Sequence, residues 1–151
     1  MQRRHLRFSH LDQARQEILR LDQGGYDRVG NWELPQIVDH LIRTMRMATD
    51  EPPFMFPAPV RMLARWMFLG KIRRGDMLKV RGRAPVALRP AADSDLEVSL
   101  AEFASLAARI ESADAPLQAV HPVFGRFTRE DWQLMQRWHA AHHLGFLLPR
   151  E

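Results

Sequence analysis

Apolar residues recur every three or four positions in four separate segments of this chain, and this spacing constrains its fold more than any other feature. Such spacing places the apolar side chains of a segment on one face of a helix. Four helices, with one long crossover between the second and the third, predict an all-α fold and, more specifically, a four-helix bundle. The predicted helices span residues 9–21, 31–48, 100–110 and 128–147.

Short polar residues precede these segments and are the expected helix caps. A side-chain oxygen at such a position accepts a hydrogen bond from a free backbone N–H of the first turn. The second helix also carries Pro35 in its first turn, where a missing N–H is tolerated. The predicted N-caps are Ser9, Asn31, Ser99 and Thr128.

The crossover between the second and third helices contains one further helical pattern. Residues 50–59 hold four of the ten prolines and predict a non-helical connector. Residues 60–69 predict a short amphipathic helix ended by Gly70, with Trp66 and Phe68 on its apolar face. These large side chains can line a pocket, cover the bundle or form a dimer contact.

Two other segments show no helical period. Residues 71–95 are interrupted by Gly and Pro and contain at most a short strand, at residues 78–80. Residues 115–127 predict an extended connector.

At 151 residues, with 46% hydrophobic and 26% charged residues, the chain has the size and composition of one globular domain over residues 1–151. It contains no cysteine, which excludes disulfides, thiolate metal ligands and a cysteine nucleophile. No apolar run approaches the length of a membrane span, and no signal-peptide pattern opens the chain. We therefore expect a cytoplasmic protein without a membrane partner.

Two histidines of the last predicted helix point to a metal site. His139 and His143 are four residues apart, so a helix places them one above the other on one face. Trp132, Met135 and Phe146 fall on the same face, which is therefore apolar. Buried imidazoles need polar partners, and two of them on adjacent turns can bind one divalent ion, as in zinc-binding helices.

The expected third ligand is His40, which lies mid-way along the second helix among apolar neighbours. Three imidazoles leave coordination positions free for water or substrate, as catalytic sites do. Asp39 or Glu33 is expected to hold an imidazole in one tautomer. In the alternative interpretation, His40 is a hydrogen-bonded core histidine and the pair on the last helix interacts with the helix C-terminus.

Two more histidines compete for a role at this site. His142 cannot bind the same ion as His143 from one helix, because adjacent side chains diverge by about 100°. His121 precedes Pro122 and either forms a turn or approaches the mouth of the site.

Three stretches of the sequence together resemble one known family. They are Trp32-Glu-Leu-Pro-Gln-Ile-Val-Asp-His40-Leu41, His121-Pro-Val-Phe-Gly-Arg-Phe-Thr-Arg-Glu-Asp-Trp132 and His139-Ala-Ala-His-His143-Leu. The chain is similar to the DUF1569 branch of the DinB/YfiT-like superfamily of metalloenzymes. The resemblance covers the second helix and the C-terminal third, and is loose over residues 50–95.

This resemblance implies a dimeric four-helix bundle with an up-down-down-up helix order. It also implies a nickel, zinc or iron ion held by three histidines, whose positions match His40, His139 and His143. Some relatives transfer low-molecular-weight thiols such as bacillithiol, mycothiol or glutathione, and others are hydrolases. The DUF1569 branch itself implies no particular reaction.

Basic side chains are concentrated between residues 61 and 89, where Asp76 is the only acid. They can attract a nucleic acid, a phosphorylated substrate or a carboxylated thiol, or they can belong to a solvated loop. No nucleic-acid-binding motif accompanies them, so a nucleic acid is not the favoured partner. The segment contains Arg61, Arg65, Lys71, Arg73, Arg74, Lys79, Arg81, Arg83 and Arg89.

The sequence therefore predicts a divalent-metal protein with a three-histidine site, acting as a thiol transferase or hydrolase on a small molecule. Its catalytic residues are unassigned. The chain has no serine-nucleophile elbow, phosphate-binding loop or dinucleotide fingerprint, which disfavours those reaction classes. The alternatives are a non-enzymatic metal-binding or stress-response module, and binding of an anion or nucleic acid through residues 61–89.

Overall fold

The computed structural model describes residues 2–79 and 83–150. This part of the chain is mostly helical, as the all-α prediction requires, and its strands are two or three residues long. The helical elements are α1 (Leu11–Gly24), α2 (Leu34–Thr49), α3 (Ala58–Ala64), the π-helical stretch η1 (Arg65–Leu69), α4 (Gly70–Arg73), the 3-10 turn η2 (Val86–Leu88), α5 (Leu96–Glu111) and α6 (Arg129–Leu144). The strands are β1 (Tyr26–Arg28), β2 (Val120–His121), β3 (Gly125–Arg126) and β4 (Leu147–Pro149), with β1 antiparallel to β4 and β2 antiparallel to β3.

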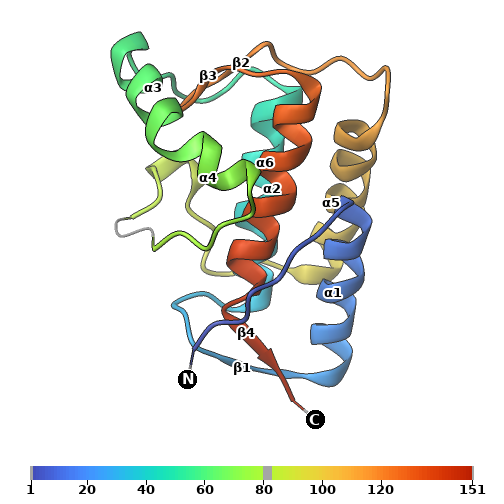
Figure 1. Ribbon diagram of the computed structural model, residues 1–151. Coiled ribbons are helices and arrows are strands. Elements are labelled where there is room, and N and C mark those ends of the chain that lie inside the picture. The colour runs from blue at the N-terminus through green and yellow to red at the C-terminus, as the bar shows by residue number, and fades with distance from the viewer. Residues whose placement is uncertain (1, 80–82, 151) are drawn as a thin grey trace.

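The long helices α1, α2, α5 and α6 lie side by side (Figure 1). Both α1 and α2 pack against α5 and α6. Because β1 follows α1 and pairs with β4, which follows α6, these two helices end at the same end of the molecule. The side chain of Gln133 near the start of α6 donates to the carbonyl of Ile110 at the end of α5. Gln118 lies in the connector before α6 and contacts its first turn through Trp132. The N–H of Gln118 donates to the carbonyl of Ala48 at the end of α2, so this end of α2 lies near the start of α6. Therefore α2 and α5 run opposite to α1 and α6.

The apolar stripes of the long helices form the core between them. In α1 the predicted stripe is buried, and Ile18 and Leu21 have no exposed surface. Phe103 of α5 and Trp132 of α6 are the bulkiest fully buried side chains. The indole N–H of Trp132 donates to the carbonyl of Gln118 at 2.7 Å, so its burial leaves no unpaired donor. Full burial of one large apolar side chain stabilises the fold by about 1.5–3 kcal/mol.

The N-cap of α6 is Thr128, as predicted. Its hydroxyl accepts from the N–H of Asp131, and the Asp131 carboxylate accepts from the N–H of Thr128. This reciprocal pair is a capping box. The helix ends at Leu144, before the predicted end at Leu147, because Leu147 pairs with β1.

The predicted caps of the other long helices are wrong. An imidazole nitrogen or a carboxylate oxygen accepts a hydrogen bond from a backbone N–H of the first helical turn, as a hydroxyl oxygen does. Residues with these groups lie nearer to the observed helix starts than the predicted caps do. The imidazole of the α1 cap accepts from Asp12, and the carboxylate of the α5 cap accepts from Val98. The caps of α1, α2 and α5 are His10, Glu33 and Asp95, in place of Ser9, Asn31 and Ser99.

The helix predicted over residues 60–69 begins earlier and continues further. It starts at Ala58 and runs through η1 and α4 to Arg73. Gly70 has ordinary right-handed helical angles, so the predicted stop there is wrong. The chain leaves the helix at Gly75, whose φ of 73° is a left-handed conformation that glycine adopts without strain.

This helix packs one side on the protein, including Leu69 and Ile72, and exposes the other. No residue of α3 is buried, and Trp66 of η1 is 82% exposed. Phe68 is partly buried against the core. The side turned toward the protein carries Arg65, whose guanidinium donates to the carbonyls of Phe124 and Arg126. Of the roles left open for these side chains, covering the bundle therefore does not apply to Trp66.

The segments that flank the site contain little regular structure. No strand forms at residues 78–79, and Val80 lies outside the described residues. The carboxylate of Asp39 accepts from the N–H of Ala91 at 2.8 Å, which ties residues 84–95 to α2. The extended connector at 115–127 is found, and includes the hairpin of β2 and β3.

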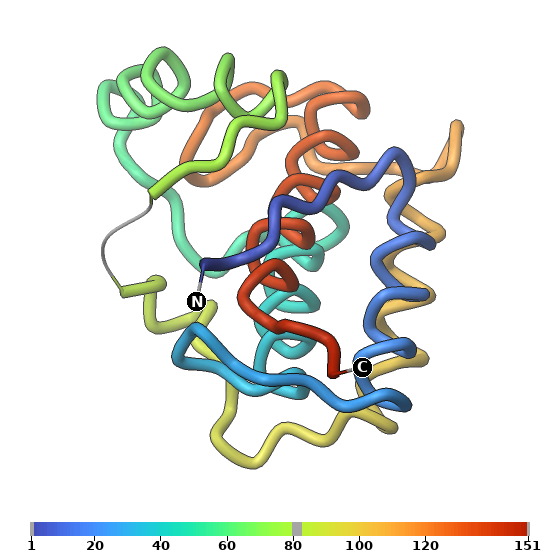
Figure 2. The backbone as a smooth tube through the Cα atoms, turned by 60° about the horizontal axis from the view of Figure 1, so that its bottom comes forward, coloured from blue at the N-terminus to red at the C-terminus, as the bar shows by residue number. Residues whose placement is uncertain are grey.

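The N-terminal segment crosses the C-terminal half of α6 (Figure 2). The N–H of Arg4 donates to the carbonyl of Gly145, and its guanidinium donates to the carbonyls of Leu144 and Leu147. The bonds to Leu144 and Gly145 occupy carbonyl groups that the end of α6 leaves without intrahelical partners, and the bond to Leu147 reaches β4. Within the described residues, none of the helices combines the length and apolar character that crossing a membrane requires.

Candidate metal centre

The structure brings His40, His139 and His143 together between α2 and α6. One ring nitrogen from each lies within 4.8 Å of the others. The Nε2 atom of His139 is 3.3 Å from Nε2 of His40 and 3.0 Å from Nε2 of His143. The i,i+4 pair on α6 and the opposing histidine on α2 thus form one cluster that can hold a metal ion.

The spacing of these nitrogens suits ligands of one small ion. Zinc binds imidazole nitrogens at about 2.0–2.1 Å, so neighbouring ligands of a tetrahedral ion are about 3.3 Å apart. The observed separations of 3.3 and 3.0 Å are close to that value. In residues 2–79 and 83–150, no carboxylate or fourth histidine joins the cluster.

A backbone carbonyl fixes the tautomer of His40. Its Nδ1 is 2.6 Å from the carbonyl oxygen of Leu88. A carbonyl only accepts, so Nδ1 carries the proton and Nε2 presents a lone pair to the other histidines. The bond between Asp39 and the N–H of Ala91 holds the segment that supplies this carbonyl.

A hydroxyl fixes the tautomer of His139 in the same way. Thr44 donates its hydroxyl proton to the carbonyl of Leu41 at 2.8 Å, and its oxygen lies 3.3 Å from Nδ1 of His139. That oxygen therefore accepts from Nδ1–H, which leaves the lone pair of His139 on Nε2. Gln136 donates to the carbonyl of Thr44, and both side chains are buried.

Two lone pairs consequently face each other 3.3 Å apart, on His40 and His139. They repel each other, and a metal ion, a proton or the Nε2–H of a neutral His143, whose Nε2 lies 3.0 Å from that of His139, relieves the repulsion. Burial disfavours the proton, because it lowers the pKa of His40 and lowers that of His139 well below its ordinary value. The pKa of His143 is also well below the usual value, first through burial and then through the neighbouring imidazoles. Neutral imidazoles are the form that binds a metal.

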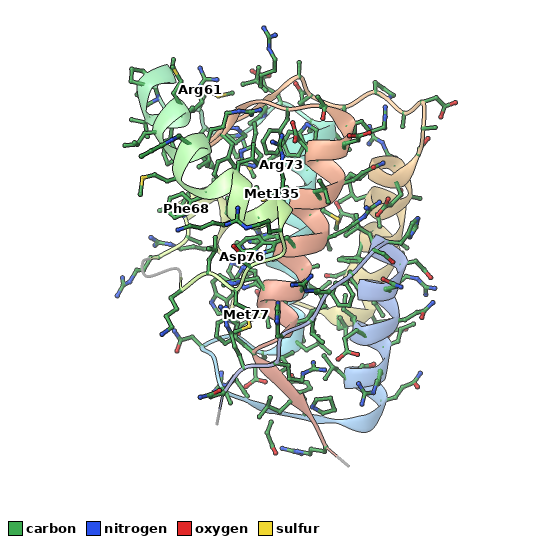
Figure 3. The ribbon with its side chains drawn as sticks, in the orientation of Figure 1. Arg61, Phe68, Arg73, Asp76, Met77 and Met135 are labelled. Carbon is green, nitrogen blue, oxygen red and sulfur yellow. The ribbon has the colours of Figure 1, made fainter. Side chains whose placement is uncertain are left out.

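The cluster is walled on some sides and open on another. The ring of Trp32 stacks on His143, with centroids 5.5 Å apart, and lies 4.8 Å from the ring of His40. The indole of Trp138 donates to the carbonyl of Asp76, so the segment after α4 runs along α6 (Figure 3). His40 is buried, whereas His139 and His143 are partly exposed. Solvent therefore reaches part of each of the two α6 histidines.

The groups that orient the imidazoles are not the two carboxylates that we expected. Asp39 accepts from Arg43 and from the backbone of Ala91, and Glu33 accepts from Tyr26 and caps α2. Neither carboxylate bonds a histidine of the cluster, so that expectation is wrong. The orienting groups are the carbonyl of Leu88 and the hydroxyl of Thr44. Thr44 stands four residues after His40 on the same helix face, a signal that was open to sequence reasoning.

The other two candidate histidines lie outside the cluster. His142 accepts from Arg3 through Nδ1 at 2.8 Å and stacks on Trp138. Burial, and then the charge of Arg3, lowers its pKa to about 4. His121 accepts from the N–H groups of Val123 and Phe124, which organises the turn between β2 and β3.

Several cations of the basic segment are engaged with other groups of the protein. Arg73 pairs with the buried carboxylate of Asp131 at 2.6 Å, and Arg74 pairs with Asp76. Burial alone would raise the pKa of Asp131, but the Arg73 guanidinium and the hydrogen bonds of Thr128 hold it below its ordinary value. Arg65 and Arg89 donate to backbone carbonyls, and Arg81 lies outside the described residues.

Comparison with known proteins identifies the family of this chain. No curated protein and no solved structure matches it. A family model described as a protein of unknown function, DUF1569, matches residues 1–150. The match spans all three stretches on which the sequence resemblance rests, so the chain belongs to the DUF1569 family.

Proposed function

We propose that this protein binds one divalent metal ion through His40, His139 and His143 and acts on a small molecule at the open side of the site. The observation that carries the proposal is that the Nε2 atoms of His40 and His139 approach each other. Both residues are held in their tautomers by hydrogen bonds at Nδ1, to the carbonyl of Leu88 and to the hydroxyl of Thr44. A metal ion shared by the two lone pairs and by His143 would remove their repulsion and use all three imidazoles as ligands. The nickel, zinc or iron ion implied by the resemblance suits three imidazole ligands.

The proposal includes the DinB/YfiT-like superfamily and its fold. The opposite directions of the two helix pairs, α1 with α6 and α2 with α5, fit an up-down-down-up four-helix bundle. In such bundles, metal sites are built from side chains on facing helices. The position of the cluster between α2 and α6 supports this assignment.

The chemistry we propose is a metal-dependent transfer of a thiol or a hydrolysis. A divalent ion in this site supplies Lewis acidity, which lowers the pKa of a nucleophile or polarises a substrate. The protein fixes the imidazole tautomers through Leu88 and Thr44, and Trp32 shields one side from water. Since no carboxylate of the described residues joins the cluster, a nucleophile that releases its proton readily fits better than water. A thiol has this property, so we favour thiol transfer.

Metal content tests the proposal directly. Untagged protein should contain near-stoichiometric nickel, zinc or iron by elemental analysis, and His40→Ala and His143→Ala should each lose it. His142→Ala is the matched control, because His142 is adjacent in sequence but bonds Arg3 instead of the cluster. If all four proteins carry no metal after reloading and are equally stable, the histidines are structural and the proposal fails.

A non-enzymatic metal-binding module is the second candidate. The absence of a carboxylate from the cluster, within the described residues, also fits a protein that only holds the ion. The two candidates differ in whether a substrate reaches the ion. Binding of a small thiol that shifts the absorption spectrum of the cobalt-loaded protein favours the enzyme, and an unchanged spectrum favours the module.

A further inference from the structure

The helix of α3 and η1 leaves large apolar side chains exposed on one side, while its other side packs on the protein through Arg65, Phe68 and Leu69. Arg65 donates to two carbonyls near the β2–β3 hairpin, while Trp66, the next residue, is 82% exposed. In a helix that covers a core, the apolar residues face inward and the charged ones face solvent. The exposed side of this helix departs from that rule and leaves large apolar side chains in water unless another surface covers them.

The exposed apolar side chains gather on one face. Along the helix they occupy positions 62 and 63 and, four residues later, positions 66 and 67, so they share one face of the helix. Met62 is 71% exposed, Leu63 54% and Met67 44%, and the adjoining connector adds Met55 and Phe56. We call these five residues and Trp66 the α3 apolar face. Figure 1 shows α3 standing away from the long helices, and Figure 2 shows the same separation from another side.

Basic residues accompany this face, and two of them, Arg73 and Arg74, are paired with Asp131 and Asp76. Residues 52–75 contain five basic residues and no acid. Lys71 lines an open hollow together with Trp66 and Met67, so a cation stands directly beside the most exposed indole. The hydrogen bonds of Arg65 go to carbonyl groups, which leave its charge uncompensated.

We propose that the α3 apolar face docks on an anionic lipid surface. A surface-lying helix places Trp, Leu and Met at the acyl boundary while Lys and Arg contact anionic headgroups. The expectation of no membrane partner rested on the length of apolar runs, which excludes a spanning helix only. Lying on the surface requires an exposed apolar face with flanking cations, and this helix has both.

The shape and charge of the face favour lipid over other partners. In a two-fold dimer the same face meets itself, so the cations of both copies would be brought together. A nucleic acid would gain little from Met62 and Leu63, which offer no stacking plane. The helix projects from the molecule instead of forming a deep groove, and a deformable bilayer accepts such a shape.

Sedimentation with vesicles tests this proposal. The wild-type protein should sediment with phosphatidylcholine vesicles that contain phosphatidylglycerol, and less with pure phosphatidylcholine. The double substitution Leu63→Ser, Trp66→Ser should reduce partitioning about tenfold or more. Lys71→Glu should reduce it about fivefold or more. Val98→Ser, which removes a 75% exposed apolar side chain from α5, should leave it unchanged.

Two further readouts separate docking from loss of fold and from self-association. Brominated lipids should quench the fluorescence of the wild type but not of Trp66→Phe, and all variants should keep the wild-type melting temperature. The proposal is overturned if sedimentation does not depend on Trp66, or if no sedimentation occurs. It is also overturned if light scattering shows a dimer that the double substitution dissociates, because a second copy then covers the face.

Discussion

Replacing Thr44 with valine should weaken metal binding by removing one hydroxyl while preserving the volume of the side chain. That hydroxyl accepts from Nδ1 of His139 and donates to the carbonyl of Leu41. Without it, the buried Nδ1–H of His139 has lost its acceptor, and the other tautomer, which puts the proton on Nε2, becomes competitive. The Nε2 lone pair that faces His40 is then partly lost.

The expected magnitude follows from the burial of Thr44. Loss of an outer group that orients a metal-bound histidine typically costs 10–100-fold in affinity, or about 1.4–2.8 kcal/mol. Thr44 is 4% exposed and Gln136 2%, so water does not readily replace the missing hydroxyl. An unpaired buried donor also costs about 1–3 kcal/mol of folding free energy.

The assay is competition with a chromophoric chelator, combined with urea unfolding of the metal-free protein. Thr44→Ser is the matched control, since it keeps the hydroxyl and should keep most of the affinity. Equal affinities of the wild type and Thr44→Val would refute the reasoning that this hydroxyl sets the tautomer of His139. A loss in both variants would point to packing of the methyl group instead.

Two further predictions concern stability. Burial lowers the pKa of His121 from 6.5 to about 3, so between these values the unfolded chain binds more protons than the folded one. The contribution of His121 to the free energy of unfolding of the metal-free protein should be fully present above pH 6.5 and be lost as the pH drops through this window. Urea titrations at several pH values measure this free energy. A flat profile would contradict the neutral, buried state of His121. Phe103→Ala should cost about 3–5 kcal/mol because Phe103 is fully buried, whereas Val98→Ala on the exposed side of α5 should cost less than about 0.5 kcal/mol. Similar losses in the two α5 variants would contradict the position of the core.

The long helices were accessible from sequence because each depends on a local pattern. The stripe from Leu11 to Leu21 and the capping box at Thr128 are signals within a few residues of chain. The i,i+4 relation of His139 and His143 is equally local. The approach of His40 to that pair depends on how α2 packs against α6, and spacing along the chain carries no such information. The position of His40 among apolar residues of the second helix made it a candidate, and the resemblance to a family supported that choice.

The parts that sequence reasoning missed depend on groups without a side-chain signature. The carbonyl of Leu88 belongs to a segment without periodicity, and any residue type provides a carbonyl. The exposure of Trp66 was also inaccessible from sequence, since a period defines a stripe but does not say where it points. The carbonyls of Phe124 and Arg126, which attract Arg65, become neighbours only in the folded chain.

X-ray absorption spectroscopy of the zinc- or nickel-loaded protein tests the central claim most directly. The account predicts three imidazole ligands at about 2.0–2.1 Å and at least one further light atom from solvent. In His40→Ala the imidazole count should fall to two, and in His142→Ala it should remain three. Fewer than three imidazoles in the wild type, or an unchanged count after removal of His40, would contradict a single ion shared by α2 and α6.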